Sequence, residues 1–377
     1  MFTGPASDEG HAGTTIPREA YTSAHMRARL LKLLAPVVIP AGLLLVWAAA
    51  ESVLTRPFFR VPATEEIPLG PVILLAEQQQ PKGHALDVDV LGHLGSRTFA
   101  LTVDGPLLYF GVGQSIAILD ISDPVNPVVV GQSKNMPDVP LNIAVRGGYA
   151  YVAAGGSGLR IYDVGEPSSL SETGFYKTSG EALSVAVVGH YAYVAVAQAS
   201  LVILDVANPA KPVAVGSHKI SGLVRRVLAK DRYMFVIGSA GLNILDVSDP
   251  VHPRDVGGYG GLGTFAQDIV VSIDSAYIAD GAWGLAILDI TDVAKPAIQR
   301  LYDTPGAATG VAFDKHYVFV ADRPFGLRVF DAEDADKLTE AGFYDARGEF
   351  WAVAVRDGYA YVARGEAGLW VIRFTQA

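Results

Sequence analysis

Short apolar runs bounded by Gly, Pro, Asp or Asn recur at a fixed interval along most of the chain. The most regular of them is IAILD at 116–120, which returns as LRIYD, LVILD, LNILD, LAILD and LRVFD. Its aspartates stand 41 to 43 residues apart, at Asp120, Asp163, Asp205, Asp246, Asp289 and Asp331, and Arg373 takes this place in a seventh copy. An interval this regular indicates internal repeats of one structural unit.

Each repeat contains four runs that have the character of β-strands. Ahead of the aspartate phrase lies an aromatic run such as YAYVA at 149–153, and a shorter run such as IAV at 143–145 precedes it. After the aspartate comes a run bounded by Pro and Gly, such as PVVVGQ at 127–132. Short runs rich in β-branched and aromatic residues predict strands. We therefore expect an all-β chain, a seven-bladed β-propeller of four-stranded antiparallel blades.

The two ends of the repeat region complement each other. The seventh unit stops after its third strand, at Phe374, so its outer strand is missing. Residues 84–94, HALDVDVLGHL, resemble that strand, with Val90-Leu91-Gly92-His93 standing where Ala214-Val215-Gly216-Ser217 stands in a later unit. We expect strand 84–94 to complete the last blade, which would close the ring without a covalent bond and remove an exposed edge.

The repeated aspartates invite a catalytic or calcium-binding interpretation, but a turn explains them better. The segment Asp-Val-Ser-Asp-Pro at 246–250 has the composition of a turn, in which carboxylates accept backbone N–H groups and proline fixes φ. Six copies around a ring cannot form one active site. The phrase therefore predicts structure rather than chemistry.

The unit GLNILDVSDPVHP at 241–253 resembles the LVIVD repeat, which is found in exported and surface-attached bacterial and archaeal propeller proteins. The resemblance covers about residues 84–377 and implies the propeller fold. It implies no activity, because that family is largely uncharacterised. The sixth unit departs from the pattern, since Ala332-Glu333-Asp334-Ala335 lacks the proline, and the seventh has Arg373 in place of aspartate.

An uncharged stretch near the N-terminus predicts one transmembrane or signal helix. Residues 33–50, LLAPVVIPAGLLLVWAAA, carry no charge, and Arg27, Arg29 and Lys32 precede them. A helix of this length spans about 27 Å, near the minimum for a bilayer's hydrocarbon core. The basic flank predicts that the residues before it stay in the cytoplasm and that the rest is exported. The expected organisation is a cytoplasmic or leader segment 1–32, the helix 33–50, a Pro-rich linker 51–83 and the propeller 84–377.

Two interpretations of segment 33–50 remain open. An uncleaved anchor would tether the propeller to the membrane, and the long segment ahead of the helix favours it. A cleaved signal is the alternative, because Ala48-Ala49-Ala50 fits a small-residue cleavage site and Met26 could be the true start. Both place the propeller outside the cytoplasm, at the cell surface or in the periplasm. Cleavage after Ala50 would make it a secreted protein.

Composition narrows the choice of partners. The 377 residues include 39 acidic and 29 basic side chains and no cysteine, which gives a formal net charge of −10. A nucleic-acid partner is not expected, because binding to a phosphate backbone relies on clustered Lys and Arg. Disulfides and cysteine metal sites are excluded. The histidines show no metal-binding spacing, so no cofactor is expected, and calcium is the one metal left open.

A functional site is expected where the repeats differ from one another. The end of the second strand is charged in three consecutive units and uncharged in the other four, and the start of the first strand, beside the central channel, is charged in two. Both positions fall on one rim if strands alternate in direction, and nearby loops add aromatic and cationic side chains. The candidate binding residues are Arg226, Asp268, Asp280, Trp283, Asp322, Arg323, Trp351 and Arg364. Aromatic residues beside Arg and Asp are typical of an interface or a ligand cup.

Two functions fit these residues. The first is a non-catalytic, membrane-tethered extracytoplasmic propeller, a scaffold that binds a protein, a small molecule or a glycan. The second is a metal-dependent hydrolase of lactonase-like type, in which Asp268, Asp280 and Asp322 hold a divalent cation at the channel. The fold alone does not decide between them. The sequence favours binding, because Arg226 and Arg364 occupy two places where a metal site needs carboxylate or histidine.

Thermal melting with and without calcium separates these two functions. A ligand that binds only the folded state raises the melting temperature. The binding function predicts the same midpoint in calcium and in a chelator. An increase of several degrees in calcium would favour the metal-dependent hydrolase.

Overall fold

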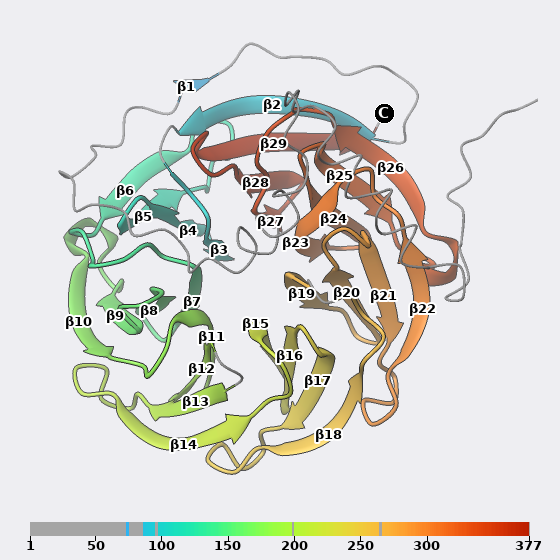
Figure 1. The fold of residues 1–377 in the computed structure, drawn as a ribbon. Coiled ribbons are helices and arrows are strands. Elements are labelled where there is room, and N and C mark those ends of the chain that lie inside the picture. Colours follow the sequence, from blue (N-terminus) through green and yellow to red (C-terminus); the bar gives the residue numbers. More distant parts are fainter. Residues whose placement is uncertain (1–72, 75–85, 95–96, 198–199, 264–265, 377) are drawn as a thin grey trace, which may run out of the picture.

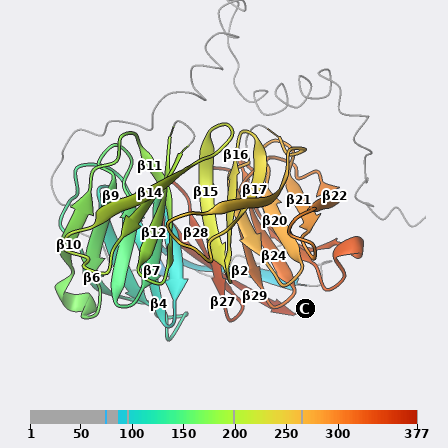
Figure 2. The same ribbon diagram turned by 90° about the horizontal axis from the view of Figure 1, so that it is seen from below.

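Seven antiparallel sheets stand around a common axis in the computed structural model, which describes residues 73–74, 86–94, 97–197, 200–263 and 266–376 (Figure 1). In six of the sheets the strand that comes first in the chain lies next to the axis and the last lies at the outside, and seen from the side the sheets form one layer (Figure 2). The predicted seven-bladed propeller of four-stranded antiparallel blades is confirmed.

The strands of the first four blades follow one another along the chain, from the axis outward. Blade 1 is β3 (Leu101–Asp104), β4 (Leu107–Val112), β5 (Ser115–Asp120) and β6 (Val128–Gln132), and blade 2 is β7 (Asn142–Arg146), β8 (Tyr149–Ala153), β9 (Leu159–Asp163) and β10 (Ser171–Tyr176). Blade 3 is β11 (Ala182–Val188), β12 (Tyr191–Val196), β13 (Ser200–Asp205) and β14 (Val213–Lys219), and blade 4 is β15 (Val224–Lys230), β16 (Tyr233–Gly238), β17 (Gly241–Asp246) and β18 (Arg254–Tyr259).

The last three blades end with the one whose outer strand comes from elsewhere in the chain. Blade 5 is β19 (Asp268–Val271), β20 (Ser275–Ala279), β21 (Leu285–Asp289) and β22 (Ala297–Tyr302), and blade 6 is β23 (Ala307–Asp314), β24 (Tyr317–Arg323), β25 (Gly326–Asp331) and β26 (Thr339–Tyr344). Blade 7 is β27 (Ala352–Arg356), β28 (Tyr359–Ala363) and β29 (Leu369–Gln376), completed by β2 (Leu86–Leu94) and, beyond it, β1 (Ile73–Leu74). Short 3-10 turns, η2 (Pro167–Ser169) and η3 (Ala335–Lys337), precede the outer strands of blades 2 and 6.

The closing strand predicted at 84–94 is confirmed as β2, which pairs antiparallel with β29. Gly92 lies opposite Val371, as Gly216 lies opposite Ile203 in blade 3, so the predicted register holds to the residue. Arg373, which replaces the repeated aspartate, lies opposite Asp89, and its Nη2 is 2.7 Å from the Asp89 Oδ2. The one unit without the repeated aspartate therefore has, in its place, an arginine that forms an ion pair across the seam of the ring.

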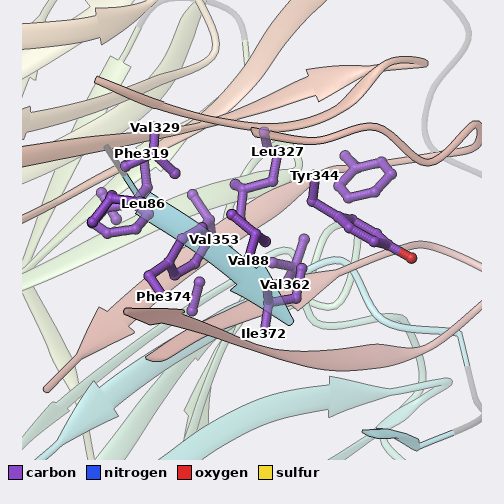
Figure 3. Close-up of a cluster of buried hydrophobic side chains, with 14 of the residues drawn as sticks. Leu86, Val88, Phe319, Leu327, Val329, Tyr344, Val353, Val362, Ile372 and Phe374 are labelled. Atoms are coloured by element: carbon purple, nitrogen blue, oxygen red, sulfur yellow. The ribbon is translucent and has the colours of Figure 1, made fainter. Parts of the chain in front are cut away.

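Buried apolar side chains join the closing strand to both of its neighbours. Leu86 and Val88 of β2 lie among Phe319 and Val329 of blade 6 and residues of blade 7 such as Phe374 (Figure 3). Burying a side chain of this size stabilises the fold by about 1.5 to 3 kcal/mol. β2 therefore contributes to the core between blades 6 and 7 as well as to the sheet of blade 7.

Glycines in the outer strands let adjacent blades approach closely. A Cβ added at Gly131 in β6 would lie 1.8 Å from the Pro167 carbonyl oxygen of blade 2, and one at Gly257 in β18 would lie 1.9 Å from the Val293 oxygen of blade 5. No side chain fits at such a distance. The turn that precedes β10 thus packs against β6 of the blade before it, and the turn that precedes β22 packs against β18.

The repeated aspartates are turn residues, as the sequence predicts. Each carboxylate accepts the N–H of the residue two places further on at 2.8 to 3.0 Å, at Asp120, Asp163, Asp205, Asp246, Asp289 and Asp331. Hydrogen bonds of this kind favour the charged form. Those from Thr291 accordingly lower the pKa of Asp289.

The predicted membrane segment 33–50 lies outside the described residues and stays a prediction, as do segment 1–32 and most of linker 51–83. In the part of the chain that the structure describes, no helix has the length and apolar character needed to cross a bilayer.

Removal of the closing strand should weaken the whole ring. We expect a chain that begins at residue 95 to melt at least about 10 °C below one that begins at residue 84, because five buried apolar side chains of β2 and a seam of backbone hydrogen bonds are lost. Differential scanning calorimetry of the two chains measures this. Equal midpoints would contradict closure by β2.

Candidate binding face

The predicted site residues lie on one face of the propeller, which we call the entry face. It carries the turns between the second and third strands of each blade and the connections between blades. Because the strands of a blade are antiparallel, the end of the second strand and the start of the first lie at the same face. Both positions therefore lie at the entry face.

Side chains at the start of the innermost strands form an axial belt, made of Asn142, Ser184, Arg226 and Asp268. The Asn142 Oδ1 accepts the N–H of Val185 at 2.9 Å, and the Ser184 Oγ accepts that of Val227 at 3.2 Å. Each of these bonds reaches the next blade. The belt therefore links consecutive blades around the axis.

The two charged members of the belt pair with each other. The Arg226 Nε lies 2.9 Å from the Asp268 Oδ1, while the Asp268 Oδ2 accepts the N–H of Val311 in the next blade at 3.2 Å. Burial raises the pKa of Asp268, and Arg226 opposes that effect. The contacts of Arg226 and Asp268 thus hold blades 4, 5 and 6 to one another.

Asp280 is enclosed beneath the connection that enters its own blade. Its Oδ2 accepts the N–H of Gly263 at 2.8 Å, and its Oδ1 has no hydrogen-bond partner in the described part of the chain. Only 1% of the residue is exposed, and this burial raises its pKa to about 7. The half-buried Trp283 packs against the same connection, since a Cβ at Gly263 would lie 2.9 Å from its Cδ1.

Asp322 in blade 6, like Asp280 in blade 5, accepts hydrogen bonds from the connection that enters its own blade. Its Oδ1 accepts the Thr304 hydroxyl at 2.8 Å, and its Oδ2 accepts the N–H of Gly306 at 2.9 Å. Thr304 and Gly306 belong to the connection between blades 5 and 6. Burial raises the pKa of Asp322 to about 6.

Arg364 also binds the connection that enters its own blade, blade 7, but as a hydrogen-bond donor rather than an acceptor. Its Nη2 donates to the Arg347 carbonyl at 3.0 Å, and its guanidinium lies 4.4 Å from the Phe350 ring centre and 4.1 Å from that of Trp370. Burial lowers its pKa. The sequence suggested that this charged series lines an open cup. The structure instead buries all three side chains against backbone, and a binding role for them stays a prediction.

Aromatic and charged side chains from the end of β24, from the connection between blades 6 and 7 and from the segment before β3 meet in what we call the Trp351 cluster, made of Phe99, Arg323, Glu349 and Trp351. The Arg323 guanidinium lies 4.7 Å from the Trp351 ring centre, and Phe99 meets the same indole edge-on at 5.6 Å. The indole Nε1 donates to the Glu349 Oε2 at 3.0 Å. Arg323, Phe99 and Trp351 are half-buried and Glu349 is exposed, so the cluster is available to a partner.

A pocket of about 320 Å³ opens on the entry face at blade 2. Its walls include Asp138, Gly156, Ser157, Arg160, Phe175 and Lys177. Differences between repeats at single positions do not reveal these residues, because they come from two connections, a turn and two strands. Two blades nevertheless share a sequence pattern that includes some of these residues. Blade 2 has GLR at 158–160 and SETGFY at 171–176, and blade 6 has GLR at 326–328 and TEAGFY at 339–344.

The shared sequence pattern of blades 2 and 6 forms the same contacts in both, between an arginine, a glutamate and a phenylalanine. Arg160 pairs with Glu172 at 2.8 Å and lies 4.8 Å from the Phe175 ring centre. Arg328 pairs with Glu340 at 3.0 Å and lies 4.7 Å from the Phe343 ring centre. The arginine, glutamate and phenylalanine therefore serve packing of the outer strand in each blade.

The structure places no ready-made ligand set for a metal ion among the residues that it describes, where no three His, Asp or Glu side chains come together. The three carboxylates considered for that role each accept a hydrogen bond from a backbone N–H of the protein.

The burial of Asp280 predicts a pH-dependent stability. Its pKa is about 7 in the folded state and near 3.9 in an unfolded chain, so the folded state binds more protons between these values and stability falls as pH rises through them. Asp280→Asn keeps an acceptor for Gly263 and cannot ionise. We expect its gain in free energy of unfolding to grow from near zero at pH 4 to about 2 to 4 kcal/mol at pH 8. Urea denaturation at pH 4, 6 and 8 measures this, and parallel curves for the two proteins would refute it.

Searches for similar proteins return the fold and the repeat. Solved structures similar to this chain include RRP9 WD40 repeats (13% identity, 80% of this chain and 100% of that chain, TM-score 0.61) and U3-55K (13%, 76% and 98%, 0.61). The computationally designed Ika8 protein is also similar (11%, 75% and 98%, 0.57). At these identities the likeness shows the fold alone. No curated protein matches the sequence.

The LVIVD repeat matches over more than half of the chain. The matched stretches are residues 98–134, 141–178, 179–219, 221–260, 263–304 and 347–372. All four strands of blade 6 fall in the unmatched interval, and this is the blade whose aspartate phrase lacks its proline. Six consecutive matches arranged as blades of one ring lead to one conclusion: the chain belongs to the LVIVD repeat family.

Proposed function

We propose that this protein is a membrane-tethered, extracytoplasmic propeller that binds a partner on its entry face and performs no catalysis. The observation that carries the proposal is the Trp351 cluster, in which an arginine and two aromatic rings remain accessible at neighbouring blade boundaries. Trp and Arg are enriched among the residues that dominate binding energy at protein interfaces. The partner proposed is therefore a protein, with a small molecule or glycan as the alternative ligand.

The export part of the proposal rests on the sequence. Segment 33–50 is uncharged and follows Arg27, Arg29 and Lys32, which is the arrangement expected of a helix whose C-terminal side is exported. The propeller carries the excess of negative charge and has no cysteine, so it folds without disulfides in either compartment.

The binding part is supported by what the buried carboxylates do. Asp268, Asp280 and Asp322 each accept a backbone N–H that belongs to a blade boundary or a connection. Side chains that hold connections in place make the entry face rigid. A rigid scaffold with varied loops is a common arrangement for recognition.

The absence of cysteine allows a direct test in cells. We would introduce single cysteines at Arg347, which is exposed beside the Trp351 cluster, and at Ile273, which is 95% exposed in the turn between β19 and β20 on the opposite face. A membrane-impermeant maleimide should label both positions in intact cells if the propeller is exported. A photo-crosslinking maleimide should then yield a partner adduct from position 347 and little from position 273.

A further substitution controls for chance contact. Trp351→Ala in the Arg347→Cys chain should reduce the adduct at least about tenfold, because truncating an interface tryptophan removes one or more kcal/mol of binding free energy. Labelling that requires cell lysis would overturn export. Equal adducts from the two faces would overturn binding on the entry face.

A further inference from the structure

The pocket on blade 2 presents opposite charges at the two ends of one residue. The Asp138 Oδ2 accepts the backbone N–H of Gly156 at 2.9 Å, and the Lys177 ammonium donates to the carbonyl of the same Gly156. The backbone of one residue, with a hydrogen bond at each end, therefore connects the carboxylate to the ammonium. Both keep hydrogen-bonding capacity, since a carboxylate has about four acceptor sites and an ammonium three donors.

The negative side of the pocket is the connection between blades 1 and 2. The Asp138 Oδ1 accepts the N–H of Val139 at 2.8 Å, which fixes the carboxylate at the pocket wall. Glu181 lies close enough for the two carboxylates to interact, because burial and then the charge of Asp138 raise the pKa of Glu181. A cationic group of a ligand would be favoured here.

The positive and apolar side is the outer edge of blade 2. Arg160 is paired with Glu172, whereas Lys177 has no carboxylate within ion-pair distance among the described residues. Phe175 is 56% exposed, with the Arg160 guanidinium 4.8 Å from its ring centre. A carboxylate group and an apolar side chain of a ligand would be favoured on this side.

The pocket is open because blade 2 lacks a large side chain in its turn. The turns of blades 2 and 5 have the same hydrogen bond, from Ala154 N to Gly158 O at 2.9 Å and from Asp280 N to Gly284 O at 2.8 Å. Ser157 occupies in blade 2 the place that Trp283 occupies in blade 5. A serine here leaves space where the other blade has an indole.

From this juxtaposition we propose that the blade 2 pocket binds a free α-amino acid with an apolar side chain. The ammonium group pairs with Asp138, the carboxylate pairs with Lys177, and the side chain lies against Phe175. Charge-assisted hydrogen bonds at both ends give selectivity for a molecule that carries both charges at this spacing. A volume of about 320 Å³ is at the small end of the range for ligand pockets, which suits a single amino acid.

This site is separate from the proposed function. It uses no residue of the Trp351 cluster, and its test uses the purified propeller without a partner or a membrane. Its failure would therefore leave the proposed function standing, and the reverse also holds.

Three probes with the same phenyl ring test whether binding requires both the ammonium and the carboxylate. L-phenylalanine carries an ammonium and a carboxylate, phenethylamine only the ammonium, and 3-phenylpropanoate only the carboxylate. Isothermal titration calorimetry at low salt should show binding of L-phenylalanine, and each of the other two should bind at least about tenfold more weakly. Glucuronate is the fourth probe, because a sugar acid also offers a carboxylate and a ring.

Substitutions locate the binding at this pocket. Lys177→Met and Asp138→Asn should each weaken L-phenylalanine at least about tenfold, and Lys177→Arg should restore much of the loss. Phe343→Ala is the matched control, because it removes the same packing partner of arginine in blade 6 and should leave affinity unchanged. Lys177 is exposed, so its substitutions should not alter the melting temperature.

Four outcomes would overturn the proposal. They are no binding of L-phenylalanine up to about 10 mM, equal binding of a single-charge probe, tighter binding of glucuronate, and full affinity in Lys177→Met.

Discussion

The pairing of β2 with β29 is the interaction on which the rest of the structure depends. Blades in a ring contact only their neighbours, so an unpaired last blade would expose an outer edge and loosen the boundary beside it. The apolar cluster shows this dependence, because Leu86 and Val88 lie between side chains of blades 6 and 7. In blades 1 to 6 the place of Arg373 is held by an aspartate that binds its own turn. At the seam no turn follows, and the same place holds the cation that pairs with Asp89. The same position of the repeat thus stabilises a turn in six blades and the closure of the ring in the seventh.

The other boundaries follow a similar principle, in which a residue acts on the blade next to its own. Asn142, Ser184 and Asp268 accept N–H groups of the next blade, and Gly131 and Gly257 receive a carbonyl oxygen of the next blade's turn. Where the belt position is Gly310 and offers no side chain, the preceding Thr309 donates its hydroxyl to the Phe350 carbonyl of blade 7. These polar residues near the axis are thus buried without losing hydrogen bonds, because each forms one with the next blade.

The repeat made most of the fold predictable from the sequence, and the same property hid much of the site. Strand number, closure by residues 84–94 and the turn role of Asp246 follow from periodicity and turn chemistry. Charge at Asp280 and Asp322 was visible, but its burial was not, because that depends on Gly263 and Gly306 in connections whose course has no periodic signal. The pocket was missed for the same reason: Asp138 and Lys177 meet only through Gly156, and neither residue is unusual at its own position.

A contrast between the two faces explains why recognition is to be sought on one of them. The strand bounds leave seven residues between the third and fourth strands in each of blades 1 to 6, and the aspartate of each turn is engaged by its own backbone. The connections on the entry face vary from four residues, as between β22 and β23, to nine, as between β6 and β7. The longer ones supply Asp138 of the pocket and Glu349 and Trp351 of the cluster. On the face opposite the entry face, the turns between third and fourth strands pack against the preceding blade, so a change of sequence there would cost stability. On the entry face the same ring tolerates insertions, which lets a structural repeat acquire local chemistry without altering its fold.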